Sequence, residues 1–301
     1  MARRDIKIRT GDGDLAAWLY EPANDAGRPV PCVVLAHGFT GVRDMQLDRP
    51  AARFAAAGYA AIVFDYRHFG DSDGQPRQLL DLRKQYEDWD AAIRFARGAE
   101  GVDPKRIVLW GTSFSGGHVI DAAARDGEIA AAVIQAPFAD GLDQVLRTKK
   151  TLLPRLVLDA WRDQIRSWTR RVPFYIPVAC PPGGYAVLAV PHVWTSIPVV
   201  VPNGSTWRNE VAARLLLRLG LHRPIARSKE VTCPLLVQIL PDETVLGTTP
   251  ARRVADRAPH GELRAYDGLD HFDIYQGEAF ELLNADQLEF LTRTVSTITA
   301  P

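Results

Sequence analysis

The sequence predicts an α/β fold, in which a mostly parallel, twisted sheet carries helices on both faces and a cap is inserted before the last two strands. Short apolar runs rich in Val, Ile, Leu and Ala alternate with longer segments of helical character. This alternation is typical of parallel strands that are joined through helices packed on the sheet. A length of 301 residues suits one such domain with an insertion.

The elements follow from these patterns in chain order. An opening hairpin is predicted over residues 6–20. Six further strands are predicted at residues 32–36, 60–65, 107–110, 131–135, 234–240 and 263–266. Four core helices are predicted at residues 50–57, 79–97, 116–125 and within 279–296. Gly58 and Gly98 end the first two helices.

Residues 138–228 interrupt the alternation and are interpreted as the cap, with residues 1–137 and 229–301 forming the core. Helices are expected at its flanks, at residues 140–149, 156–168 and 210–219. Residues 172–207 contain no charged side chain, but seven prolines divide this stretch. A membrane-spanning helix needs about 20 apolar residues in unbroken helix, so no integral membrane segment is predicted.

Aromatic side chains of the cap are candidates for lining an apolar substrate pocket above the sheet. Together they favour a bulky or hydrophobic substrate group. Each of them alone could equally pack the cap onto the core or contribute to a subunit interface. The candidates are Trp161, Trp168, Tyr175, Trp194 and Trp207.

A serine stands at the turn between the predicted strand at 107–110 and the following helix. Ser113 has small residues two positions before and two positions after it, Gly111 and Ser115, which allow a cramped strand-turn-helix connection. Such a turn holds a hydroxyl clear of the sheet at a helix N-terminus, so Ser113 is the predicted nucleophile. If Ser115 were the apex instead, it would lie inside the helix, and Gly111 would no longer occupy the tightest point of the turn.

A nucleophilic serine also needs a base and donors for the oxyanion. His271 is the predicted base, because it follows the last strand in a loop, whereas the other six histidines occupy less suitable positions. His37 follows the strand at 32–36, where the main-chain N–H groups usually act instead of the side chain. The N–H groups of Phe39 and Phe114 are therefore the predicted oxyanion donors.

The carboxylate that orients the histidine is expected after another strand, between the serine and the histidine in chain order. The strand at 234–240 ends in a turn that carries both Asp242 and Glu243. Glu243 is favoured, because a polar and then an apolar residue follow it, and Asp242 remains the alternative. Either residue could accept a hydrogen bond from the imidazole.

These segments, in this order, resemble serine hydrolases of the α/β-hydrolase superfamily. The motifs are HGFTG at 37–41, GTSFSGG at 111–117, PDETV at 241–245 and DHF at 270–272. Residues 63–74 are similar to the D-x-R-G-x-G-x-S loop of that superfamily. The whole chain resembles the dienelactone-hydrolase/acetyl-xylan-esterase-like and X-Pro-peptidase-like esterases.

The resemblance implies the α/β-hydrolase fold and hydrolysis of a small-molecule carboxylic ester through an acyl-enzyme, with no metal or organic cofactor. Ser113, His271 and Glu243 would form the triad. A thioesterase, an amidase or a C–C hydrolase would use the same triad and remains an alternative. A non-catalytic protein that binds an apolar ligand is a further hypothesis from another class.

The bulk composition fits an ordinary enzyme. The 36 basic and 36 acidic residues give a formal net charge of zero without a basic run, which argues against a nucleic-acid partner. The N-terminus lacks the apolar core of a signal peptide, so a cytoplasmic location is expected. The three cysteines are widely spaced and predict free thiols rather than a disulfide framework or a zinc site. Homo-oligomerisation remains possible.

Overall fold

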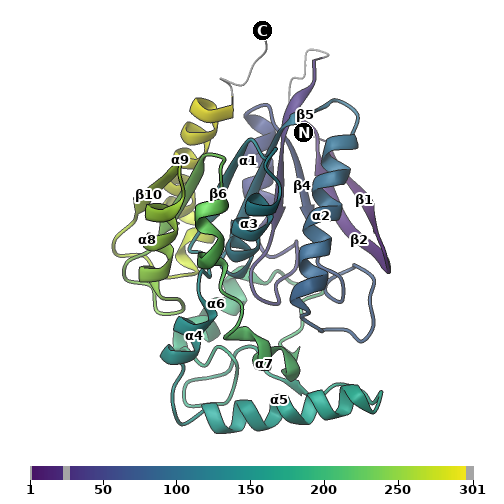
Figure 1. Cartoon of the computed structure of the whole chain (residues 1–301), viewed down its shortest axis with the longest axis vertical. Helices are drawn as coiled ribbons and strands as arrows, with labels where there is room; N and C mark the ends of the chain where they lie inside the picture. Colours follow the sequence, from purple (N-terminus) through teal and green to yellow (C-terminus); the bar gives the residue numbers. More distant parts are fainter. Residues whose placement is uncertain (1, 23–27, 296–301) are drawn as a thin grey trace.

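An eight-stranded sheet forms the centre of the computed structural model, which describes residues 2–22 and 28–295 (Figure 1). The strands lie in the order β1-β2-β4-β3-β5-β6-β9-β10. β1 and β2 are antiparallel, and β2 is also antiparallel to β4, whereas all the other pairs in the sheet are parallel. The predicted fold class, a mostly parallel α/β sheet, is therefore confirmed.

The strands of this sheet are β1 (Arg3–Thr10), β2 (Gly13–Tyr20), β3 (Val30–Ala36), β4 (Ala60–Phe64), β5 (Val102–Thr112), β6 (Ala131–Gln135), β9 (Leu235–Ile239) and β10 (Gly261–Ala265). Every residue of β4, β6 and β9 is buried, which explains why these strands show no alternation and are apolar except for Gln135 and Gln238. β5 begins earlier than its apolar run predicts, because Val102 pairs with Val30 ahead of a bulge.

Helices cover both faces of the sheet, as predicted. On one face, α1 (Asp48–Ala56) and α9 (Gly277–Val295) pack on side chains such as Val33 and Val63. On the other face, α2 (Leu82–Gly98), α3 (Phe114–Arg125) and α8 (Thr248–Arg257) pack on side chains such as Val34 and Ile62. α8 was not among the predicted helices. Residue 296, the predicted end of the last helix, lies outside the described residues.

The start of α2 differs from the prediction for a local reason. The helix begins at Leu82, whereas residue 79 was expected. The carboxylate of Asp81 accepts hydrogen bonds from the main-chain N–H groups of Arg83 and Lys84, and so caps the helix.

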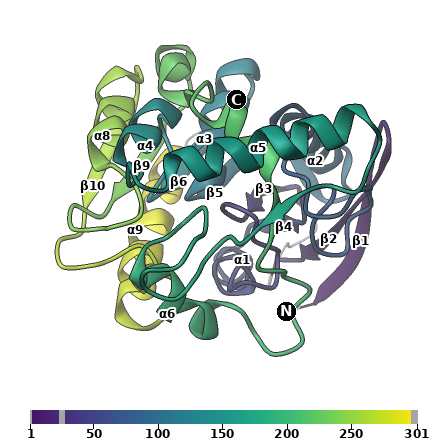
Figure 2. The same cartoon turned by 90° about the horizontal axis from the view of Figure 1, so that it is seen from below.

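Most of the chain between β6 and β9 lies beyond the carboxyl ends of the parallel strands, at the bottom of Figure 1, and its last part returns along α3. Its elements are α4 (Gly141–Arg147), α5 (Leu153–Trp168), β7 (Tyr175–Ile176), α6 (Pro191–Val200), β8 (Val211–Ala212), the 3₁₀ turn η1 (Ala213–Leu215), α7 (Leu216–Leu219) and the 3₁₀ segment η2 (Pro224–Glu230). Figure 2 shows α5 running across this end of the molecule. None of the helices within the described ranges is both long and apolar enough to cross a bilayer.

The helix predicted at 210–219 is wrong in its first half. Val211 and Ala212 form β8, which pairs with Ile176 and Tyr175 of β7. The main-chain N–H of Ala212 also donates to the carbonyl of Gln78, 2.9 Å away. These partners are distant in sequence, so tertiary pairing overrides the local helical preference, and only Leu216–Leu219 form a short α-helix.

Candidate active site

Ser113 occupies the sharp turn between β5 and α3. Its φ and ψ angles are 55° and −122°, a conformation that is rarely adopted by residues with a side chain. A Cβ atom at Gly111 would lie 2.5 Å from the carbonyl oxygen of Ser115, so only glycine fits there. The turn is anchored to its neighbours, because the Ser113 N–H donates to Gln135 and the Ser113 carbonyl accepts from Phe138.

Ser115 replaces the second glycine expected in such a turn, and the structure accommodates its hydroxyl. Its Oγ lies 2.5 Å from the hydroxyl of Tyr66 in the buried interior. The Tyr66 hydroxyl also accepts a hydrogen bond from Trp89 Nε1 at 2.8 Å, and either hydroxyl of the Tyr66–Ser115 pair can donate to the other. Ser115 is thus held in the core, and Ser113 stands at the apex of the turn.

Ser115→Ala is expected to lower the free energy of unfolding by about 1–3 kcal/mol, because the buried Tyr66 hydroxyl loses a hydrogen-bond partner. Urea denaturation measures this loss. A fluorophosphonate should still label Ser113 in this variant. Abolished labelling with unchanged stability would contradict the assignment and favour Ser115 as the nucleophile.

The structure brings Ser113, His271 and Glu243 together, although they come from three separate segments. Ser113 Oγ lies 3.0 Å from His271 Nε2, and His271 Nδ1 lies 2.5 Å from Glu243 Oε2. His271 and Glu243 are both buried. In the tautomer that donates from Nδ1 to the carboxylate, Nε2 is free to accept the serine proton. Asp242 instead accepts a hydrogen bond from the N–H of Gly268 at 2.8 Å.

The loop after β3 lies directly against the serine turn. A Cβ atom at Gly38 would lie only 2.9 Å from Ser113 Cβ, which shows how closely the two segments approach. The rings of Phe39 and Phe114 meet edge to face, with centroids 5.6 Å apart. Within residues 28–295, neither the Phe39 nor the Phe114 main-chain N–H donates to a protein acceptor. Both predicted oxyanion donors are thus available to a ligand.

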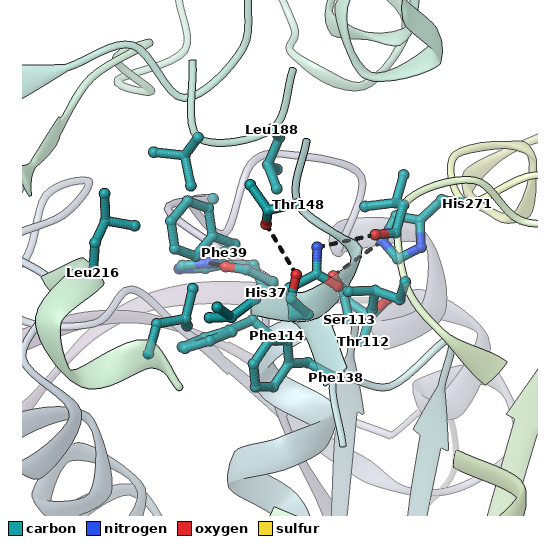
Figure 3. Close-up of a pocket in the computed structure, with 18 of the residues that line it drawn as sticks. His37, Phe39, Thr112, Ser113, Phe114, Phe138, Thr148, Leu188, Leu216 and His271 are labelled. Carbon is teal, nitrogen blue, oxygen red and sulfur yellow. Dashed lines mark hydrogen bonds between the residues drawn. The ribbon is translucent and has the colours of Figure 1, made fainter. Parts of the chain in front are cut away.

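A cavity of about 180 Å³ opens beside Ser113 and His271 (Figure 3). Phe39, Phe114 and Phe138 contribute aromatic rings from the core side. The aliphatic part of the wall comes mainly from the chain between β6 and β9. Its aliphatic members are Val145, Leu153, Leu156, Val157, Ala160, Val187, Leu188, Val200, Leu216, Leu217 and Leu219. Gln144 and Thr148 are the polar side chains that this part of the chain adds to the wall.

The five predicted aromatic pocket residues lie elsewhere, so the expectation that they line the cavity is not met. Trp161 and Trp168 are exposed on the outer face of α5, and Trp194 is exposed on α6. The Tyr175 hydroxyl donates to the carbonyl of Arg77, and Trp207 packs against the main core. Aliphatic side chains on the opposite face of α5, which the sequence did not single out, take their place.

Aromatic and histidine rings pack behind the serine turn. The Phe114 ring contacts His118, Phe138 and His222, with centroids 5.0 to 5.2 Å apart. His222 stacks on Phe138 and lies 3.0 Å from the hydroxyl of Tyr86 through Nδ1. Burial lowers the pKa of His222 to about 4 and that of His118 well below its usual value. Both imidazoles are therefore neutral at pH 7, a feature that the sequence did not indicate.

As the pH falls, the His222→Phe variant should lose less stability than the wild type loses. Folded His222 resists protonation until about pH 4, whereas the unfolded state takes up a proton near pH 6.5. Between those pH values, this site therefore lowers the free energy of unfolding of the wild type by about 1.4 kcal/mol for each unit that the pH falls. The variant lacks this contribution. Urea denaturation at several pH values measures the difference between the two proteins. A difference that is constant with pH would contradict the prediction.

The sheet order and the serine turn after the central strand β5 place this chain in the α/β-hydrolase superfamily, and solved structures share its fold. The crystal structure of the α/β hydrolase GrgF from Penicillium sp. sh18 matches with a TM-score of 0.84 and 24% sequence identity. The match covers 98% of this chain and 100% of GrgF.

Sequence comparison places the chain more narrowly. The family model of X-Pro dipeptidyl-peptidase (S15 family) matches residues 12–171. The quorum-quenching protein AidA of Acinetobacter baumannii is 40% identical over 292 residues, which cover 97% of this chain and 95% of AidA. The thiohydrolase aneE of Aspergillus aculeatus is 26% identical over 273 residues, covering 87% and 85% of the two chains. The chain belongs to the S15 family and is a hydrolase of the α/β-hydrolase superfamily.

Proposed function

We propose that this chain hydrolyses a carboxylic ester through an acyl-enzyme on Ser113. His271 Nε2 takes the serine proton while Oγ attacks the ester carbonyl, and Glu243 stabilises the imidazolium that forms. The N–H groups of Phe39 and Phe114 hold the oxyanion. His271 then gives its proton to the departing alcohol, and a water molecule activated by His271 releases the acid. The observation that carries this proposal is the hydrogen-bonded chain from Ser113 through His271 to Glu243.

Residues 138–228 serve as the cap over this site and select the substrate. Most of the cap side chains that reach the cavity are aliphatic, so they favour a hydrophobic acyl or alcohol group. AidA is named a quorum-quenching protein, and we propose that the substrate of this chain is likewise a signal molecule of quorum sensing. For this chain, that signal would carry an ester bond and an apolar chain.

Thioester hydrolysis is the second candidate, because one relative of this chain is named a thiohydrolase. The same three side chains would act, and only the leaving group would change from an alcohol to a thiol. Turnover of an ester and a thioester that share one acyl chain distinguishes the two candidates. An amide of the same acid extends the comparison to amidase activity.

Covalent labelling tests the proposed nucleophile. After treatment with a fluorophosphonate, intact-protein and peptide mass spectrometry should show stoichiometric modification of Ser113, which Ser113→Ala eliminates. Turnover of p-nitrophenyl esters of increasing chain length, measured in parallel, shows which acyl chain length the cavity prefers. Absence of both labelling and ester turnover in the folded wild type would refute the proposal and favour a binding protein for apolar ligands.

A further inference from the structure

The outer face of α5 carries an exposed apolar stripe. Leu158, Trp161, Ile165 and Trp168 are spaced by three or four residues, which places them on one side of the helix. Their exposed fractions are 53%, 47%, 53% and 67%, respectively. The two indole rings lie side by side, with centroids 6.3 Å apart. Figure 1 shows α5 at the outer edge of the molecule, and the exposed fractions show that the stripe is open to solvent.

The opposite face of α5 packs against the rest of the protein, so the helix does not need the stripe for its own packing. Leu156 and Ala160 are buried and line the cavity. Asp159 and Asp163 are buried on the same side of the helix, and both have partners. Asp159 accepts from the hydroxyl of Tyr185 at 2.6 Å. Asp163 accepts from the Arg214 guanidinium at 2.7 Å and from the main-chain N–H of Phe174 at 2.8 Å. These bonds fix the orientation of the helix.

Positive charge is concentrated around this stripe. Residues 141–171 contain eight Lys and Arg but only three Asp, a formal net charge of +5 in a chain whose total is zero. Two of the three aspartates are the buried Asp159 and Asp163. Five exposed cations close to the two ends of α5 take part in no ion pair within the described part of the chain. They are Arg147, Lys149, Lys150, Arg170 and Arg171.

We propose that this surface, which we call the α5 face, docks on a bilayer that contains anionic lipids. The α5 face consists of the four stripe residues and the five cations close to the ends of the helix. Tryptophan and aliphatic side chains enter the boundary between headgroups and acyl chains, and the cations attract anionic headgroups. The helix lies in the plane of the membrane and does not cross it.

The charges also argue against a second copy of this chain as the partner. Two α5 faces brought together would place their unpaired cations close to one another, which is unfavourable. An anionic lipid surface neutralises the same charges. Val157 lines the cavity and is itself half exposed beside the stripe. Docking would thus bring the cavity wall to the membrane surface, where apolar molecules concentrate.

Vesicle co-sedimentation of the full chain tests this proposal. The wild type should bind vesicles of phosphatidylcholine mixed with phosphatidylglycerol more strongly than vesicles of phosphatidylcholine alone. The double variant Trp161→Ala/Trp168→Ala should bind the mixed vesicles about tenfold or more weakly. Arg170→Glu/Arg171→Glu should weaken the preference for phosphatidylglycerol. Leu282→Ala removes an exposed leucine from α9, away from this face, and should bind like the wild type.

Turnover of a water-soluble ester and the thermal unfolding temperature should be the same in the tryptophan double variant and the wild type, because neither tryptophan lines the cavity. Undiminished vesicle binding by the double variant, or no dependence on phosphatidylglycerol, would overturn the proposal. Sedimentation velocity provides a further check. A wild-type dimer that the double variant lacks, without vesicle binding, would assign the α5 face to a second copy. Vesicle binding does not require ester turnover, so the two proposals can fail independently.

Discussion

Glu243→Gln is expected to lower kcat by about 10⁴-fold, as the matching neutralisation of the triad carboxylate does in serine proteases. Glu243 Oε2 lies 2.5 Å from His271 Nδ1 in a buried site. Glutamine lacks the negative charge that stabilises the imidazolium, and its amide can donate to Nδ1 and so favour the wrong tautomer. KM should change little, because Glu243 does not line the cavity. Steady-state kinetics on a p-nitrophenyl ester measures both constants.

Asp242→Asn is the matched control for this substitution. Asp242 accepts a hydrogen bond from the N–H of Gly268, and the asparagine carbonyl can accept the same bond. This variant should therefore retain nearly all of the wild-type kcat. The opposite outcome, with a severe defect in Asp242→Asn and a mild one in Glu243→Gln, would reassign the acid to Asp242.

Much of the candidate site could be predicted because parallel strands share one polarity. Ser113 follows β5, Glu243 follows β9 and His271 follows β10. The carboxyl ends of parallel strands lie at one edge of the sheet, so residues that follow different strands converge there. The apolar runs indicated these strands, and the sequence therefore indicated the convergence. The sequence separates the adjacent Asp242 and Glu243 less clearly. Both are carboxylates, and the backbone conformation of the turn decides which of them faces the histidine.

The inserted segment was harder to predict, because distant residues decide which faces of its helices are buried. In α5, the buried side carries Asp159 and Asp163, which a sequence pattern assigns to solvent. Their partners Tyr185 and Arg214 come from much later in the chain. The exposed side carries tryptophans, which a pattern assigns to the interior. The helical period identified two faces, but tertiary partners determined which of them packs against the cavity.

Gly38→Ala is expected to lower kcat by about 10²- to 10³-fold, the usual effect of losing one oxyanion donor. The new methyl group would lie 2.9 Å from Ser113 Cβ, 3.3 Å from Ser113 Oγ and 3.4 Å from the carbonyl oxygen of Thr112. Ser113 is fixed between β5 and α3, so the loop at 37–41 must move instead. That movement displaces the main-chain N–H of Phe39 from the position where the oxyanion forms.

Gly127→Ala is the control, since Gly127 is exposed and a Cβ atom there would meet no other atom within 4 Å. It should leave both kcat and the unfolding temperature unchanged. If Phe39 provides an oxyanion donor, Gly38→Ala should depress kcat and the rate of fluorophosphonate labelling far more than it depresses stability. A variant that unfolds at a lower temperature but retains wild-type kcat would show that Gly38 serves packing alone. The second oxyanion donor would then have to be sought outside this loop.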